Sequence, residues 1–257
     1  MSAITALAST LSNSVTDVQA KISDVQNQLA SGKKNLNSAE SGEVTRLSAQ
    51  VTGYTQTGKN IGQAQNAINV GLTALTSVTS LLTTMKQIAT QANNAGLADS
   101  DLTALQTTFA QLAGQVNDAI SGASLNGTNV LSADLLVSTG IDGAVTTVTA
   151  PTLTAVDVSA DDVSTGATTA ITDVTAALEA VSVAQSGLNA SAAGLSAQAT
   201  SAASLASNLQ STVDSIQNID QTAMQAQLQQ LNNQQSIDYY LVSQMNTEAS
   251  AALTIFR

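Results

Sequence analysis

Apolar residues recur at alternating steps of three and four near the start of the chain. This places them on one face of a helix, with Ser, Asn, Asp and Gln on the other faces, a pattern typical of a coiled-coil seam. Gly32 tolerates the left-handed conformation that follows a helix end, so we expect the first helix to stop at Ser31. The stripe consists of Ile4, Leu7, Leu11, Val15, Val18, Ile22, Val25 and Leu29.

Two more helices are predicted before the middle of the chain. Residues 33–56 are less regular, with two glycines and mixed charges, but apolar stripes return over 61–92 and 102–120. Residues 93–96 predict a break between these helices, and Asp99 or Ser100 is the expected N-cap of the later one. Because the connection is short, we expect the two helices to be antiparallel neighbours.

The middle of the chain has a β-like pattern. Asn126-Gly127 is a strong two-residue turn signal, since both residue types accept positive φ. Residues 135–163 are rich in Val and Thr, partly alternating, and are interrupted by Gly140, Gly143 and Pro151. This pattern predicts short β-hairpins in a small subdomain.

Helical spacing returns after Thr168 and continues to Ile216, and a last stripe runs from Met224 to Phe256. Residues 218–220 predict a break, and either Ile237 or Asp238 fits the last stripe. The fold class is therefore mainly α: an elongated arrangement of long antiparallel helices, with a terminal coiled-coil domain and a small β-hairpin subdomain. Each terminal stripe can be buried against the other. A lone pair of helices with such small apolar side chains is only marginally stable in water, which predicts self-association.

Composition narrows the function. The chain has 257 residues, 2% aromatics and no Cys, His or Trp, which excludes thiol and imidazole chemistry and most zinc sites. Asp161 and Asp162 are an adjacent acidic pair, but adjacent acids at a surface are usually solvated and do not hold a metal. The segment from Gly140 to Gly143 lacks the spacing of a phosphate-binding loop. We therefore expect no enzyme activity, no cofactor and no metal. A net charge of −11 argues against nucleic acid and anionic membranes as partners.

Neither a signal peptide nor a membrane span is recognisable. The first 20 residues have no basic segment followed by an apolar one, and no apolar run reaches ~18–20 residues. Taken alone, these observations favour the cytoplasm.

Several segments, in order along the chain, resemble bacterial flagellins. They are Leu29-Ala-Ser-Gly32 with Asn37-Ser-Ala39, Lys59-Asn60, Leu125-Asn-Gly127 with Val130-Leu131, the acidic break Ile216 to Ala223, and Leu253-Thr-Ile-Phe-Arg257. Two departures from the family pattern occur: an extra residue after Gly32, and Ile61-Gly-Gln in place of the usual Asn-Asp-Gly.

The resemblance implies a division of the chain into parts. Residues 1–40 and 218–257 would form the terminal coiled-coil domain, residues 41–124 and 168–217 the two halves of a helical rod, and residues 125–167 its β-hairpin segment. The short middle leaves no room for large outer domains, so the chain resembles a minimal flagellin.

The resemblance also implies a function, a subunit of the flagellar filament used for swimming. Such a protein is secreted through the flagellar export apparatus, which would explain the absent signal peptide, and it lies outside the cell. Its partners would be copies of itself, an export chaperone, the filament cap and hook-associated proteins.

We expect self-assembly to depend on the terminal stripes. The candidate residues are Leu7, Leu11, Val18 and Ile22, packing in the polymer against Leu241, Met245, Leu253 and Phe256. Two alternatives stay open: a hook–filament junction protein with the same terminal domains, and a signalling coiled coil of the chemoreceptor type.

Overall fold

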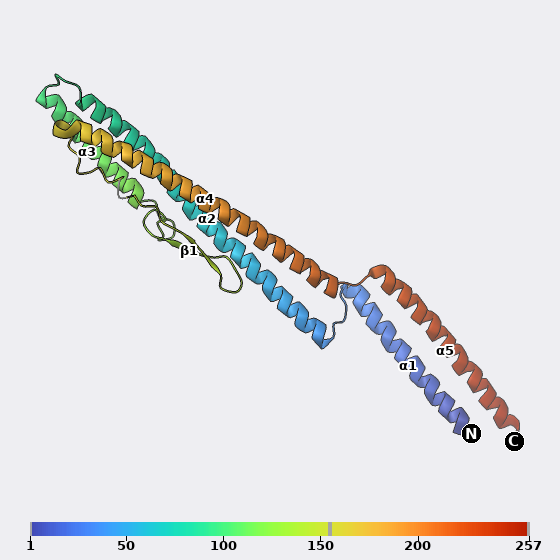
Figure 1. Ribbon diagram of the computed structural model, residues 1–257. Helices are drawn as coiled ribbons and strands as arrows, with labels where there is room; N and C mark the ends of the chain where they lie inside the picture. The colour runs from blue at the N-terminus through green and yellow to red at the C-terminus, as the bar shows by residue number, and fades with distance from the viewer. Residues whose placement is uncertain (1, 154–155, 256–257) are drawn as a thin grey trace. The chain divides into compact units, whose positions relative to one another are not determined.

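The computed structural model describes the backbone of residues 2–153 and 156–255, and side chains within these ranges except those of 2–5, 249 and 252–255. Within this part of the chain the fold is mainly helical, with one small antiparallel sheet, as predicted (Figure 1). The elements are α1 (Ser2–Ser31), α2 (Ser38–Ala92), α3 (Asp99–Ser121), β1 (Leu135–Ser138), β2 (Val145–Val148), α4 (Val163–Gln217) and α5 (Gln221–Ile255).

The chain divides into two compact units. Met1–Ser48 and Leu209–Arg257 form the first, which we call the terminal unit, and Ala49–Asn208 forms the second, the rod unit. The longest helices, α2 and α4, each contribute to both units. The five-part division expected from the sequence stays a prediction.

In the terminal unit, α1 and α5 lie side by side and run in opposite directions, so that the start of α1 lies beside the end of α5 (Figure 1). Gly32 has φ +68° directly after α1, as predicted for a helix end. The segment after α1 pairs with the segment before α5: Lys33 and Asn218 form an antiparallel bridge, and the Lys34 amide donates to the Gln217 carbonyl at 2.7 Å. We call this pairing the connector ladder.

The helix α2 begins much earlier than the sequence indicated. The Asn37 side chain accepts the Glu40 amide at 2.9 Å, and the Glu40 carboxylate accepts the Asn37 amide at 3.0 Å. This reciprocal pair is a capping box, which satisfies two amides at the helix start. From there the helix is continuous to Ala92, although the apolar spacing becomes regular only from residue 61. Val44 and Leu47 are buried with Val213 in this part of the terminal unit.

In the rod unit, α2, α3 and α4 lie side by side and the β-hairpin lies along them (Figure 1). α3 folds back along α2 after the break at 93–96, in agreement with the prediction. The core is built largely from small aliphatic side chains, with Phe109 as its one buried aromatic among the described residues. Its largest fully buried side chains are Phe109, Ile61, Ile68, Leu75, Leu82, Met85, Leu188 and Leu195.

The predicted turn at Asn126-Gly127 is present. Both residues have positive φ, 52° and 82°, and Leu125 pairs with Thr128 across the turn. Of the short hairpins expected over 135–163, the described residues form one, in which Val137 and Val148 face the core while Leu136 and Val145 face outward.

Two helix starts differ from the sequence prediction. α3 is preceded by Ala98, which makes no side-chain cap, so neither Asp99 nor Ser100 is the N-cap. α4 begins at Val163 rather than after Thr168, because the Asp162 carboxylate accepts the Ser164 amide at 2.8 Å and thereby caps the helix. The helix is irregular at Gly166, which explains why the apolar spacing becomes regular only beyond it.

Candidate self-assembly interface

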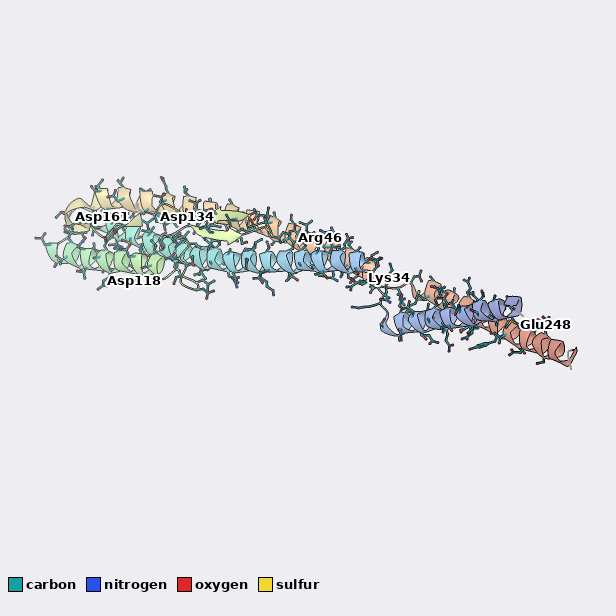
Figure 2. The ribbon with its side chains drawn as sticks, turned by 90° about the horizontal axis from the view of Figure 1, so that it is seen from below. Lys34, Arg46, Asp118, Asp134, Asp161 and Glu248 are labelled. Atoms are coloured by element: carbon teal, nitrogen blue, oxygen red, sulfur yellow. The ribbon has the colours of Figure 1, made fainter. Side chains whose placement is uncertain are left out.

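The acidic residues of the rod unit do not gather into a metal centre. Within the described residues, no three His, Cys, Asp or Glu side chains lie close enough together to hold an ion. Figure 2 shows Asp118, Asp134 and Asp161 at separate places along this unit. The helices instead offer apolar surfaces for packing, and the terminal unit exposes several apolar side chains beside a small buried seam.

The seam between α1 and α5 is the core of the terminal helix pair. Val18, Ile22 and Val25 from α1 and Leu231 from α5 are buried against one another. Full burial of such a side chain contributes about 1.5–3 kcal/mol. Leu29, Met224 and Leu228 extend the seam toward the connector ladder, partly buried. Because the buried set is small, the pair has little apolar area to offset the entropy of ordering two long helices.

The predicted assembly residues occupy different positions relative to this seam. Val18 and Ile22 lie in it and share a cluster with Leu228 and Leu231. The remaining described ones lie beyond the buried set: Leu11 and Met245 are half-buried, and Leu7 and Leu241 are 59% and 44% exposed. The side chain of Leu253, and Phe256 altogether, lie outside the described residues.

A polar contact continues the seam beyond Val18. Asp238 is buried, 7% exposed, and its Oδ2 accepts a hydrogen bond of 3.0 Å from the Ser14 hydroxyl. Its neighbour Ile237 is 59% exposed. The sequence left open which of the two faces α1, and the structure places the carboxylate inward and the apolar side chain outward.

Six seam residues were absent from the candidate set: Val25, Leu29, Met224, Leu228, Leu231 and Asp238. The apolar stripes already contained the first five, at the same three–four spacing as the chosen ones. They could have been found by aligning the two stripes antiparallel from the paired breaks at Gly32 and Asn218. Asp238 fits the spacing as well as Ile237 does, but nothing in the sequence favours the carboxylate, since a carboxylate is seldom buried.

The helix surfaces carry few charges and many hydroxyls that bind their own backbone. Thr10, Thr45 and Thr76, for example, each donate to the carbonyl four residues earlier. The described salt bridges join near neighbours in sequence: Lys21–Asp17, Lys34–Glu40 and Arg46–Glu43. Between residues 221 and 247 of α5, the sequence contains one charged residue, the buried Asp238.

Among the described helices, α2 is long and apolar enough by composition to cross a membrane. In the rod unit, Ile68, Leu75 and Leu82 of this helix are fully buried in the core, and Leu72 and Leu81 pack against that core partly buried. We therefore interpret α2 as the core helix of the bundle.

Comparisons with known proteins identify the family. Among solved structures, the chain resembles the crystal structure of Bacillus cereus flagellin, with a TM-score of 0.49 and 19% identity over 56% of this chain and 88% of that one. A comparison with curated proteins finds no match. The family model of the bacterial flagellin N-terminal helical region matches residues 4–134, just over half of the chain. The chain therefore belongs to the bacterial flagellins, a family of structural filament proteins.

Proposed function

We propose that this chain polymerises into a flagellar filament that serves swimming, and that the terminal helices α1 and α5 carry the polymerisation. The observation that supports this most directly is the terminal unit itself. It presents long helices with regular three–four spacing, but Val18, Ile22, Val25 and Leu231 are the whole of its buried apolar α1–α5 seam among the described residues.

The energetics of this pair favour association. An isolated helical pair gains most of its stability from packing, and a short seam leaves it marginal. Meanwhile Leu7, Ile237 and Leu241 expose apolar surface on the same two helices. Adding further copies would bury this surface and complete the packing, which is the usual solution in a homopolymer.

The remaining parts of the proposal concern partners and location. A filament subunit works outside the cell, so export through the flagellar apparatus and an export chaperone are part of the proposed function. The filament cap and hook-associated proteins would be its neighbours at the two ends of the polymer. We propose no catalytic activity and no cofactor for the chain.

Elongation of filament seeds tests the role of the seam. Ile22 is buried in the seam, whereas the next residue, Ser23, is exposed. Both changes to Asp add the same charge, but only Ile22→Asp places a carboxylate in apolar surroundings, at a cost of several kcal/mol. By electron microscopy, we expect Ile22→Asp to fail to elongate sheared wild-type filaments, and Ser23→Asp to elongate them at close to the wild-type rate.

Complementation tests the wider function. A bacterium that lacks its own flagellin should regain filaments and swim when it expresses the wild-type chain, and should stay non-motile with Ile22→Asp. Normal filaments from Ile22→Asp would contradict the role of the seam. Failure of the wild-type chain to assemble in any form would contradict the proposed function.

A further inference from the structure

The burial of Asp238 gives α5 two distinct faces. Positions 224, 228, 231, 235, 238, 242 and 245 are the buried or half-buried ones along the described helix, and they follow the three–four spacing toward α1. At about 100° per residue, Ile237, Tyr240 and Leu241 share another side of the helix. Their side chains are 59%, 67% and 44% exposed.

Burial of apolar surface alone would place Ile237, rather than Asp238, against α1. If α5 turned by one residue about its axis, Ile237 would face α1 and Asp238 would face water. A buried carboxylate costs free energy unless it is hydrogen-bonded, and here the Ser14 hydroxyl provides a bond of 3.0 Å. A buried polar residue in a helical seam is known to specify register and orientation at some cost in stability. The contact between Ser14 and Asp238 therefore holds α5 in the rotation that leaves the apolar side chains outward.

We propose that Ile237, Tyr240 and Leu241 form a docking face for a second copy of this chain, and that Asp238 orients α5 to present it. The inference rests on the proposed function, because it names the surface through which neighbouring terminal units meet. It differs from the seam in one respect: the seam joins helices of one subunit, whereas the docking face joins subunits.

Charge favours a second copy as the occupant. The chain carries a net charge of −11, so copies repel one another wherever acidic side chains meet. Between residues 221 and 247 the single charge of α5 is the buried Asp238, so the docking face and its helical neighbours Asn233 and Gln244 are neutral. An uncharged surface with two large aliphatic side chains and a tyrosine is suited to burial against a like-charged copy.

Exchanging the two residues tests the proposal with no change of composition. The double variant Ile237→Asp, Asp238→Ile makes the seam more apolar and puts the carboxylate on the docking face. We expect it to keep the helical circular dichroism of the wild type and to lose elongation of sheared wild-type filaments. Elongation at the wild-type rate would overturn the proposal, because the seam alone would then be sufficient.

A pair of neighbouring tyrosines gives a second test that leaves the seam unchanged. Tyr240 lies on the docking face, whereas Tyr239, 50% exposed, lies about 100° away around the helix. We expect Tyr240→Ser to raise the critical concentration for polymerisation about ten-fold or more, and Tyr239→Ser to change it less than about two-fold. Equal effects of the two substitutions would refute the assignment of this face.

The two tests separate this inference from the proposed function. If the wild-type chain forms no filaments, the proposed function fails and the docking face fails with it. If the wild type polymerises and both the exchange variant and Tyr240→Ser polymerise equally well, the proposed function stands and the docking face alone is wrong.

Discussion

Among the described residues, Asp161 has a buried side-chain oxygen, Oδ2, with no hydrogen-bond partner. Burial, followed by the neighbouring carboxylate of Asp173 and that of Asp157, raises the pKa of Asp161 above its ordinary value. Next to it, hydrogen bonds from the hydroxyl and amide of Ser164 lower the pKa of Asp162. Adjacent acids of the same segment therefore act on stability with opposite signs.

The pH dependence of stability should reveal Asp161. Because its folded-state pKa is raised, the folded chain binds this proton more tightly than the unfolded chain. The ionised group therefore destabilises the fold fully above the folded-state pKa, and this penalty shrinks as the pH falls through that value and is gone below the unfolded-state pKa. We predict that Asp161→Asn raises the Tm at pH 7, and that the gain shrinks in acid when thermal unfolding is followed by circular dichroism.

Asp162→Asn is the matched control for this measurement. Its pKa is lowered in the folded state, so its ionised form stabilises the fold at neutral pH, and that contribution is lost in acid. The control should lower the Tm at pH 7 or leave it unchanged. An Asp161→Asn variant that is less stable than the wild type at pH 7 would show that the carboxylate has a partner that the structure does not record.

Among the elements, α2 shows how tertiary contacts override helix propensity. Glycine in a helix interior costs about 1 kcal/mol relative to alanine. At Gly71 a Cβ atom would lie 2.7 Å from Val130 Cγ2, so the close approach of the segment after the Asn126-Gly127 turn requires glycine. At Gly62, in the same helix, a Cβ atom would meet nothing within 4 Å.

These two glycines predict opposite responses to the same substitution. Gly71→Ala should destabilise the chain by about 1–2 kcal/mol, because overpacking against a stiff valine outweighs the gain in helix propensity. Gly62→Ala should stabilise it by up to about 1 kcal/mol. Urea unfolding of both variants measures the two effects, and a stabilised Gly71→Ala would mean that Val130 can move away at little cost.

The same contrast explains what the sequence could predict at this scale. The helix end at Gly32 and the turn at Asn126-Gly127 follow from local backbone preferences, so both were predictable. The start of α2 was missed because Gly42 and Gly53 have low helix propensity and interrupt the apolar spacing of a helix that is in fact continuous. A Cβ at Gly53 would lie 2.6 Å from Ile141 Cγ2, a contact with the hairpin that spacing cannot reveal.

The candidate interface was predictable to a similar extent. Val18 and Ile22 follow from the stripe, but the facing residues depend on the antiparallel register, which is set by the connector ladder rather than by periodicity. The choice between Ile237 and Asp238 could not be made from the sequence, because both positions fit the three–four spacing. The hydrogen bond from Ser14, 224 positions earlier in the chain, accompanies the inward placement of the carboxylate.

For the whole molecule, the division into two units predicts separable stability. The large core from Ile61 to Leu195 lies entirely within Ala49–Asn208, whereas the terminal unit has two small clusters. We predict that a fragment of residues 49–208 folds into a stable monomer with a cooperative thermal transition, and that it neither elongates filaments nor binds to their ends. Circular dichroism and sedimentation measure these properties, and a fragment that is unfolded would show that the rod unit depends on the terminal helices.

The connector ladder has a mechanical consequence. The two segments that lead to α1 and α5 are joined by the Lys33–Asn218 bridge and the bond from the Lys34 amide to the Gln217 carbonyl. A force or torque applied to α1 or α5 would therefore be shared by these two chain segments, because they are hydrogen-bonded to each other. In a filament of the kind proposed above, each subunit would have to transmit torque. In this chain that torque would pass through two hydrogen-bonded segments instead of one.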